Sequence, residues 1–222
     1  MLPRILEPEA MDTPEEARDY DLMDHAQVNG RFVADFLSAH GRCRGGEILD
    51  VGTGPGQIPI ALCRADPLAR VLGIDLAEHM LARAHDNVAQ AGLADRIRLA
   101  TSDAKGLDYG DGTFEAVISN TIAHHIPDPA PALGEMARVV APGGTLFVRD
   151  LCRPDDEETL ALLVALYAGG EPPAARALFK ASLHAALTLE EVRDIVARLG
   201  LQRDDVRMTS DRHWTWCWRR PR

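Results

Sequence analysis

The sequence is poor in basic residues. Its 222 residues include 24 Lys and Arg against 34 Asp and Glu, which gives a formal net charge of −10. This balance argues against a broad electrostatic contact with nucleic acid or with an anionic membrane. The basic residues 219–222 form too short a segment to reverse it, and we interpret them as a solvated tail. We therefore expect no nucleic-acid partner.

Cysteines and long apolar segments are also scarce. The four cysteines form no C-x-x-C pair and match no zinc-module spacing. Scattered thiols in a chain with ample core are typical of a reducing compartment. The most apolar later run, residues 160–168, is far shorter than the roughly 20 residues that a spanning helix needs. No secretory signal is visible at the first residues. We predict a cytoplasmic protein without membrane insertion.

A glycine-rich turn is the central feature of what is present. Residues 48–51 form a short, mostly apolar run that fits a buried parallel strand, and residues 57–65 fit a helix. Between them stand Gly52, Gly54 and Gly56. A strand, a tight glycine turn and a helix open a nucleotide-binding βαβ unit. Glycines let a ligand approach the main chain, and the free N–H groups at the helix start point at it.

Two details of this turn bear on which ligand it holds. The third glycine comes one residue too early for the dinucleotide pattern G-x-G-x-x-G, and Asp50 ends the strand just before the turn. The form D-V-G-T-G-P-G resembles motif I of the class I S-adenosylmethionine-dependent methyltransferases. A plain structural turn is the alternative interpretation of a glycine triplet on its own.

Two further acids follow predicted strands. Asp75 ends the second strand, about 20 residues after the turn, where a carboxylate can accept hydrogen bonds from ribose hydroxyls. NAD-binding folds place an acid similarly, and a simple helix N-cap role also stays open. Ser102, Asp103 and Ala104 follow the third strand. This S-D-A triplet resembles the adenine-binding motif of the same family, although Asp103 as a turn residue is an alternative.

The resemblance extends from about residue 47 to residue 150. Residues 119–127 follow the fourth strand and resemble motif IV, which lines the gap between the donor methyl and the acceptor. The run L-G-E-M-A-R-V-V-A-P-G-G-T-L, residues 133–146, resembles a segment of ubiquinone-biosynthesis-type small-molecule methyltransferases. Glu115 stands where this family commonly has Asp.

The resemblance implies an α/β fold, a Rossmann-like three-layer sandwich. Its seven-stranded, mostly parallel sheet has an antiparallel last strand and helices on both faces. Residues 1–46 would form an N-terminal arm and a cap helix over 23–40, with residues 1–21 laid over the domain or partly disordered. Residues 47–222 would form the methyltransferase domain, with a helical lid inserted at about 151–187. A turn at 141–144, a strand at 145–148, and final strands at 202–208 and 213–218 complete the prediction.

The resemblance also implies a set of cofactor contacts, and a packing role for Tyr20 stays open beside it. The predicted contacts are Tyr20, Asp50, Gly52, Thr53, Gly54, Gly56, Gln57, Asp75, Leu76, Met80, Ser102, Asp103, Ala104, Asn120 and Thr121. The cofactor would be S-adenosyl-L-methionine, and the product S-adenosyl-L-homocysteine.

Methyl transfer from a sulfonium is a direct displacement, so placing the reactants in line is the main task. A base is needed only for a protonated acceptor. The nearest candidates for a catalytic role are Asn120, His124 and His125, and a histidine titrates near neutrality. Local hydrogen bonding by one of the two histidines is the alternative. Predicted acceptor contacts are His124, Arg149, Asp150 and His184. No ligand spacing supports a metal, and we predict none.

We therefore predict a methyltransferase that acts on a small-molecule acceptor by in-line displacement. An NAD-dependent dehydrogenase, or a partner subunit that binds the cofactor without catalysis, remains an alternative. Trp214, Trp216 and Trp218 alternate along one face of a predicted strand. Core packing or a homodimer contact explains them better than cofactor stacking does.

Overall fold

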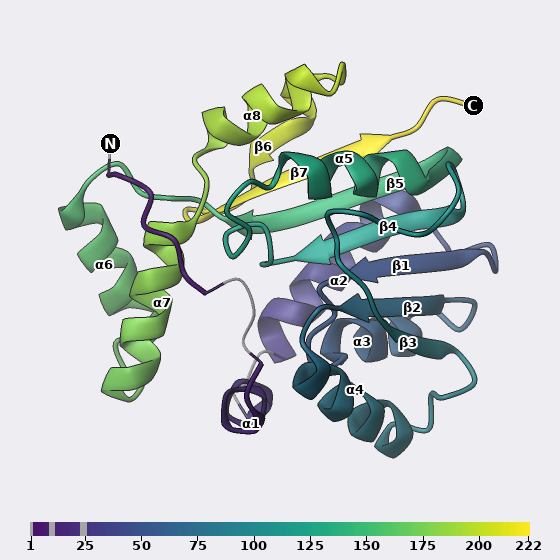
Figure 1. Cartoon of the computed structure of the whole chain (residues 1–222), viewed down its shortest axis with the longest axis horizontal. Helices are drawn as coiled ribbons and strands as arrows, with labels where there is room; N and C mark the ends of the chain where they lie inside the picture. The colour runs from purple at the N-terminus through teal and green to yellow at the C-terminus, as the bar shows by residue number, and fades with distance from the viewer. Residues whose placement is uncertain (1, 9–11, 23–25) are drawn as a thin grey trace. The chain divides into compact units, whose positions relative to one another are not determined.

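The structure is a computed structural model that describes residues 2–8, 12–22 and 26–222. Within them runs a seven-stranded sheet with the order β3-β2-β1-β4-β5-β7-β6 (Figure 1). The strands are β1 (Glu47–Val51), β2 (Arg70–Asp75), β3 (Ile97–Thr101), β4 (Phe114–Asn120), β5 (Val140–Leu151), β6 (Val206–Met208) and β7 (His213–Arg219). β1 pairs in parallel with β2 and β4, and β2 with β3, while β6 and β7 are antiparallel. The predicted sheet is confirmed.

The chain divides into two compact units. The glycine-loop unit comprises Ala10–Asn120, Pro131–Val148 and Cys217–Arg222. The His124 unit comprises Met1–Glu9, Thr121–Ala130 and Arg149–Trp216. The first holds α1 (Pro14–Leu22), α2 (Ala26–His40), α3 (Gln57–Ala65), α4 (Glu78–Gln90) and nearly all of α5 (Ala130–Val139). The second holds α6 (Glu157–Ala168), α7 (Pro173–Ala185), α8 (Leu189–Arg198) and the 3-10 turn η1 (Arg203–Asp205).

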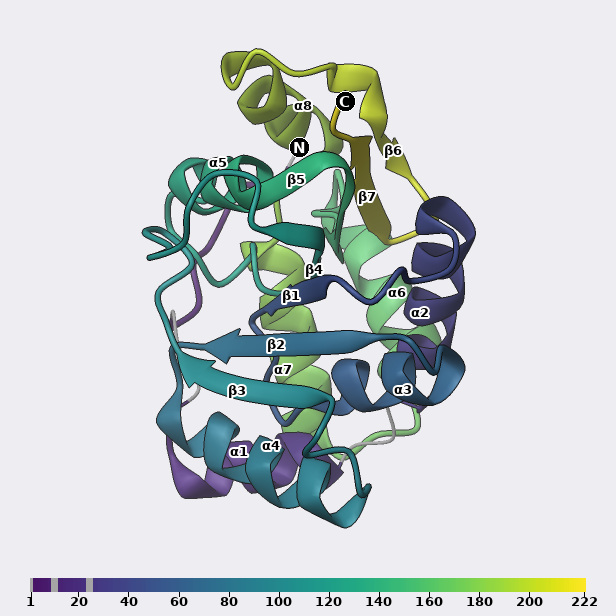
Figure 2. The ribbon, with the colours of Figure 1, turned by 90° about the vertical axis from the view of Figure 1, so that its right-hand side faces the viewer.

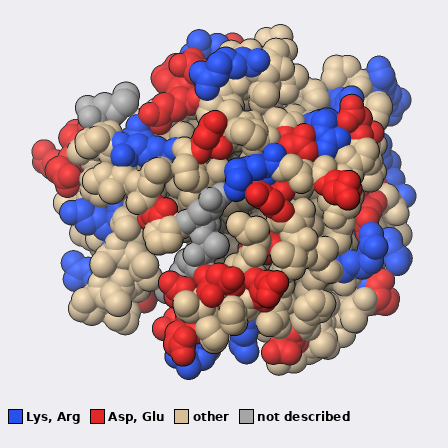
Figure 3. All heavy atoms as spheres, in the orientation of Figure 1, with Lys and Arg blue, Asp and Glu red and all other residues tan. Residues whose placement is uncertain are grey.

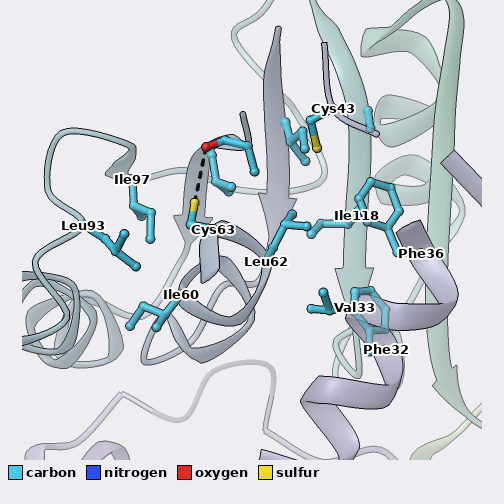
Figure 4. Packing of buried hydrophobic residues seen from close by; sticks show 14 of the residues in the cluster. Phe32, Val33, Phe36, Cys43, Ile60, Leu62, Cys63, Leu93, Ile97 and Ile118 are labelled. Carbon is cyan, nitrogen blue, oxygen red and sulfur yellow. Dashed lines mark hydrogen bonds between the residues drawn. The ribbon is translucent and has the colours of Figure 1, made fainter. Parts of the chain in front are cut away.

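Helices cover both faces of the strands in the glycine-loop unit. Figure 2 shows α5 on one side of β1 and β4, and α2 and α3 on the other. Phe32, Phe36 and Leu62 lie on the inner faces of α2 and α3 and are fully buried (Figure 4). Phe147 packs edge-on against Phe32, with ring centroids 5.2 Å apart. Burial of such side chains stabilises the unit by roughly 1.5–3 kcal/mol each.

A buried hydrogen-bond network around Glu115 joins the start of β4 to the loop before β1. Glu115 accepts hydrogen bonds from the backbone N–H groups of Arg44 (2.9 Å) and Gly46 (2.7 Å), and lies 3.2 Å from His40 Nε2. A Cβ at Gly46 would lie 2.8 Å from the Glu115 Cβ, so only glycine fits there. The departure from the family pattern at Glu115 therefore has a structural use.

The His124 unit has an apolar core of its own. Leu160, Leu163 and Val164 of α6 pack with Leu183 of α7, and Leu2 lies against this group. The side chain of Asp156 caps α6 by accepting from Thr159 N at 2.8 Å. A capping box of Thr188 and Glu191 begins α8. The insertion therefore folds as a helical hairpin, and its action as a lid stays a prediction.

The N-terminal segment contains a helix that was not predicted, α1 at residues 14–22. Thr13 Oγ1 accepts from Glu16 N at 3.2 Å, and Glu16 Oε2 accepts from Thr13 N at 3.1 Å. This reciprocal pair is a helix-start signal that the sequence analysis missed. Of the helix expected over 23–40, residues Ala26–His40 are helical, and residues 23–25 lie outside the described part. Its role as a cap stays a prediction.

Two other segments differ from the prediction. β5 begins at Val140 and includes the expected turn at 141–144. There Gly143 N donates to Arg220 O at 2.9 Å, and Arg220 N donates to Gly144 O at 3.0 Å. The strand expected at 202–208 is a 3-10 turn followed by the three-residue β6. Its start is a turn because Asp205 N donates to Gln202 O at 3.1 Å.

Charged side chains of both signs share the surface. Lys and Arg side chains are interspersed with Asp and Glu side chains on the face drawn in Figure 3. In the part of the chain that the structure describes, none of the helices has the length and apolar character needed to cross a membrane.

Candidate functional site

The glycine turn after β1 folds back onto the end of β2. Gly52, Gly54 and Gly56 all have positive φ (73°, 54° and 78°). The N–H groups of Gly52 and Thr53 both donate to Ile74 O, at 2.8 and 2.9 Å. A Cβ at Gly56 would lie 3.2 Å from Ala84 Cβ on α4, whereas a Cβ at Gly54 would meet nothing within 4 Å. Gly56 therefore serves close packing, whereas Gly54 leaves the main chain open to a ligand.

Asp75 fixes this turn through both of its carboxylate oxygens. Oδ2 accepts from Gly54 N at 2.8 Å, and Oδ1 accepts from Ala77 N at 2.9 Å. Burial nevertheless raises the pKa of this carboxyl. Each oxygen has a second lone pair, so the group can still accept from a ribose hydroxyl. The structure thus shows a turn-stabilising role, and the ribose contact stays a prediction.

Gly73 is a position that the sequence analysis missed. It pairs with Asp50 in the parallel register of β1 and β2. A Cβ at Gly73 would lie 2.7 Å from Thr53 Oγ1 and 3.0 Å from a methyl group of Leu99. The signal was available, because a glycine inside a strand often marks a close approach of another group.

Two polar atoms beneath the turn lack partners. Asp50 Oδ2 and Thr53 Oγ1 are buried and have no hydrogen-bond partner within the structure. Burial raises the pKa of Asp50 to about 7. Orphaned polar atoms are costly unless a bound group satisfies them. Together with the open main chain at Gly54, they fit a polar ligand such as the predicted cofactor.

Asp103 lies beyond β3, next to the end of β2. The register pairs Asp75 with Thr101, and Ser102 N donates to Asp75 O at 3.0 Å. Asp103 Oδ1 accepts from Lys105 N at 2.9 Å, and this bond helps to lower the pKa of the carboxyl. Asp103 is therefore an ionised acceptor with free lone pairs. The structure brings the predicted ribose and adenine acids to one edge of the sheet, with Ala104 directly following.

Other predicted cofactor contacts are engaged in packing around α1. Gln57 accepts from Asn29 Nδ2 at 3.1 Å and donates to Asp21 Oδ1 at 3.2 Å. Tyr20 and the buried Met80 belong to a small apolar cluster between α1 and α4, while Leu76 is exposed. Asp21 also accepts from Arg83 and Asn87, both at 2.8 Å, and the sequence analysis did not single out these three residues.

The chain is strained where β4 ends. Asn120 is the last residue of β4, and Thr121 follows with φ of 59°. Among the described non-glycine residues, Thr121 alone has positive φ. A β-branched residue in this conformation is a genuine outlier, and such strain clusters at functional sites. Thr121 N donates to Arg149 O at 2.8 Å, which holds the strained turn.

His124 and Asp150 form a buried pair in the His124 unit. His124 Nδ1 lies 2.6 Å from Asp150 Oδ1, and His124 N donates to Asp150 Oδ2 at 3.0 Å. Burial alone would lower the pKa of His124 and raise that of Asp150. The attraction between the two groups reverses both directions. Because Nδ1–H donates to the carboxylate, Nε2 is the ring atom left to meet another group.

His125 lies beside His124 but in a different environment. Their ring centroids are 4.1 Å apart. His125 Nδ1 lies 3.3 Å from Pro8 O and 3.5 Å from Glu7 Oε2. Burial and the neighbouring His124 lower the pKa of His125 to about 4. His125 is therefore a neutral imidazole at physiological pH, able to act as an acceptor or as a ligand.

Arg4 ties the N-terminal segment to the histidine loop, and no sequence signal pointed to it. Its guanidinium donates to the carbonyl oxygens of Ala185 (2.7 Å), Pro127 (2.8 Å) and Ile126 (2.9 Å). It also donates to His124 O at 3.2 Å. The backbone adds a bond from Ile5 N to His184 O at 3.1 Å. Residues 4–8 are thereby held along the loop that carries both histidines.

The other two predicted acceptor contacts, Arg149 and His184, have partners of their own. Arg149 is buried, and its Nε donates to Thr215 Oγ1 at 2.9 Å. His184 lies on α7, with Nε2 3.7 Å from Glu157 Oε1. Most predicted cofactor contacts thus belong to the glycine-loop unit and most predicted acceptor-side residues to the His124 unit. The exceptions are Thr121 and Asn120, respectively. Ligand contacts of either group stay predictions.

Comparisons with known proteins agree with this geometry. Residues 49–148 match the model of the family described as "Methyltransferase domain". The chain is 38% identical over 112 residues to a phosphatidylethanolamine N-methyltransferase of Cereibacter sphaeroides, covering 50% of this chain and 53% of that protein. It is 35% identical over 132 residues to a ubiquinone biosynthesis O-methyltransferase of Methylococcus capsulatus, covering 60% and 54%. The chain thus spans little more than half the length of these relatives.

Solved structures share the fold at low sequence identity. A Methanococcus maripaludis protein assigned to the S-adenosyl-L-methionine-dependent methyltransferases superposes with a TM-score of 0.74 at 19% identity, covering 98% of both chains. An Aquifex aeolicus methyltransferase gives 0.64 at 20% identity, covering 92% of this chain and 97% of that one. The [4+2]-cyclase SpnF gives 0.62 at 18% identity, covering 99% and 89%. One fold therefore carries more than one chemistry.

Proposed function

Because the chain is a member of the class I S-adenosylmethionine-dependent methyltransferases, with its methyltransferase domain at residues 49–148, we propose that it transfers a methyl group to a small-molecule acceptor. The donor is S-adenosyl-L-methionine, and the product is S-adenosyl-L-homocysteine. These relatives favour methyl transfer over the dehydrogenase that the glycines and Asp75 left open.

The observation that carries the proposal is the clustering of open main chain and two acids at one sheet edge. Gly54 offers unhindered backbone, Asp75 lies 2.8 Å from its N–H, and Ser102 N is bonded to Asp75 O. In the proposed complex, Asp75 accepts from the ribose hydroxyls and Asp103 accepts from the adenine amino group. Asp50 Oδ2 and Thr53 Oγ1, which have no hydrogen-bond partner, would be satisfied by the bound cofactor.

The chemistry supplied by the bound cofactor is an electrophilic methyl group on sulfur. The task of the protein is to hold that group in line with an acceptor atom, and such orientation supplies several kcal/mol of the barrier. We propose that Asn120, His124 and His125 contact the acceptor, with Arg149, Asp150 and His184 shaping its site. The strained Thr121 supports a functional role for the segment that begins there.

The names of the relatives support a small acceptor of lipid or quinone type. One relative acts in ubiquinone biosynthesis as an O-methyltransferase, and another is a phosphatidylethanolamine N-methyltransferase. These substrates are properties of those proteins. For this chain we propose only that the acceptor is a small molecule with a nucleophilic oxygen, nitrogen, sulfur or carbon atom.

Calorimetry with S-adenosyl-L-homocysteine tests the cofactor half of the proposal. Removing a hydrogen bond from a charged acceptor costs about 1.5–3 kcal/mol. We therefore expect Asp75→Ala and Asp103→Ala each to weaken binding about tenfold or more. Asp108→Ala, an exposed acid in the same region, should bind like the parent. If the two test variants, still folded, bind as tightly as the parent does, the proposed site is wrong.

Transfer of radioactive methyl groups tests the reaction itself. The parent should label at least one member of a panel of hydroxylated quinones, catechols and ethanolamine phospholipids. His124→Gln should lower this labelling because His124 belongs to the proposed acceptor side. The variant should still bind S-adenosyl-L-homocysteine like the parent. Tight cofactor binding with no labelling across the panel would instead favour the non-catalytic partner subunit.

We further propose that the protein works in a reducing, cytoplasmic compartment. The four cysteines are free, and Cys43 and Cys63 are buried in the apolar core. Burial raises the pKa of these two thiols to about 12 and about 11, so they are unreactive. Fractionation of cells that express a tagged chain would test the location, and recovery in an oxidising compartment would contradict it.

A further inference from the structure

We propose that Glu7, His124 and His125 form a binding site for a divalent transition metal of the zinc type. One potential ligand atom from each of these side chains lies within 4.8 Å of the others. Two imidazoles and one carboxylate are a donor set that zinc takes in proteins, usually with a further position open to water or substrate. All three residues belong to the His124 unit.

His124 is buried, Glu7 and His125 are partly buried, and Glu7 leaves one polar atom unsatisfied. The side chain of His124 is 4% exposed and that of Glu7 is 12% exposed. Glu7 Oε1 is buried and has no hydrogen-bond partner. Burying a carboxylate oxygen without a partner is costly. A cation between Glu7 and the histidines would satisfy it.

The surroundings of the two histidines are those of metal ligands. Ligating histidines almost always donate the other ring N–H to a carboxylate or a backbone carbonyl. Here Nδ1 of His124 lies 2.6 Å from Asp150 Oδ1, and Nδ1 of His125 lies 3.3 Å from Pro8 O. The carboxylate of Asp150 therefore orients the His124 ring and leaves its Nε2 as a ligand atom. His125 presents Nδ1 both to Pro8 O and to Glu7 Oε2, which lies 3.5 Å away. Asp150 also adds negative charge beside the site.

Contacts of the N-terminal segment hold the third ligand, Glu7, in place. Arg4 binds the carbonyl oxygens of the histidine loop, including His124 O at 3.2 Å and Ile126 O at 2.9 Å. The positive charge of Arg4 thus lies against backbone carbonyl oxygens of this loop. Ile5 N donates to His184 O at 3.1 Å. These bonds fix residues 4–8 so that the carboxylate of Glu7 reaches the histidines.

The geometry needs only a small adjustment to close around a metal. Zinc lies about 2.0–2.2 Å from nitrogen and oxygen ligands, so tetrahedral ligand atoms lie roughly 3.3–3.6 Å apart. Because the ligand atoms lie within 4.8 Å of one another, no pair has to approach by more than about 1.5 Å. His124 and His125 also belong to the proposed acceptor side, but a metal alone serves as the probe, so the metal site can be tested separately from methyl transfer.

Zinc titration of the chelator-treated full chain, followed by calorimetry and metal analysis, tests the site. We expect one zinc per chain in the parent. Glu7→Gln and His125→Gln should each weaken binding at least tenfold. Glu15→Gln and His85→Gln, matched exposed positions, should bind like the parent. Circular dichroism reports folding of every variant, and if one test variant fails to fold, the other decides.

Cobalt gives a readout that separates this site from the cysteines. Co²⁺ bound by nitrogen and oxygen should show visible absorption without the sulfur charge-transfer bands of thiolate ligation. That absorption should disappear in Glu7→Gln and persist after alkylation of the thiols. Zinc affinity that is equal in the parent and both test variants, or that is lost on thiol alkylation, would overturn the proposal. Absence of any stoichiometric binding would overturn it as well.

Discussion

The carboxyl group of Asp50 couples the stability of the folded chain to pH. Burial raises its pKa from 3.8 to about 7 in the folded state, so the folded chain holds this proton more tightly than the unfolded chain does. The resulting stabilisation is complete below the unfolded pKa and is lost as the pH rises through the folded pKa. Asp50 therefore weakens the fold at neutral pH unless a ligand compensates.

We expect Asp50→Asn to remove this loss. The free energy of unfolding of the variant, relative to the parent, should rise between about pH 4 and about pH 8. The upper end of the change is on the order of 4 kcal/mol. Urea unfolding at several pH values measures it, and Asp108→Asn serves as an exposed control. A parent–variant difference that stays constant over this range would contradict the assigned pKa.

Single residues also mark what the sequence could reveal about the site. Asp50, Asp75 and Asp103 could be predicted as cofactor contacts, because an acid at or just beyond the end of a parallel strand has a defined place in such folds. Arg4 could not be identified, since its acceptors are backbone carbonyls, which leave no pattern in a sequence. Glu7 was missed for the same reason, because its approach to the histidines depends on Arg4.

At the scale of elements, the contact between β2 and the glycine turn determines the shape of the cofactor region. Gly73 on β2 makes room for Thr53, since a Cβ there would lie 2.7 Å from Thr53 Oγ1. Neither group can move freely, because the turn is bonded to Ile74 O and Thr53 is buried. Strand β2 and the turn are thus one packed assembly.

Gly73→Ala tests this contact. Overpacking of a buried position costs about 1–3 kcal/mol, and the displaced turn should also bind S-adenosyl-L-homocysteine more weakly. Gly106→Ala is the matched control, because a Cβ there meets nothing within 4 Å. Thermal unfolding and calorimetry measure the two effects. Equal stability and affinity in both variants would show that the turn is free to shift.

Elements with a local signal were predictable, and elements that depend on distant partners were not. α3 has the predicted bounds, because glycines precede its first residue and apolar spacing continues through Ile60 and Cys63. β5 is longer than predicted because its first residues bond to the backbone of Arg220, far along the chain. α1 did have a local signal, the Thr13–Glu16 pair, which the weak apolar periodicity of the segment obscured.

For the whole molecule, the arrangement in two compact units bears on how a ligand acts on stability. Most predicted cofactor contacts, from Asp50 to Asn120, lie in the glycine-loop unit. A ligand that binds only the folded state stabilises it by about 2.7 kcal/mol at a concentration of 100 times its Kd. If the units unfold separately, this gain belongs to the transition of the glycine-loop unit alone.

We therefore expect saturating S-adenosyl-L-homocysteine to raise Tm by roughly 5–10 °C, since each kcal/mol shifts Tm by about 2–4 °C in a chain of this size. Differential scanning calorimetry shows whether one transition moves or all of the unfolding does. NADH at the same concentration should leave Tm unchanged, because the third glycine stands too early for a dinucleotide pyrophosphate. An equal shift with NADH would mean that the turn and Asp75 recognise a ribose without distinguishing what is attached to it. In that case Asp103, which is proposed to read the adenine shared by both ligands, would have no part in the choice, and the preference for a sulfonium donor would have to reside on the acceptor side.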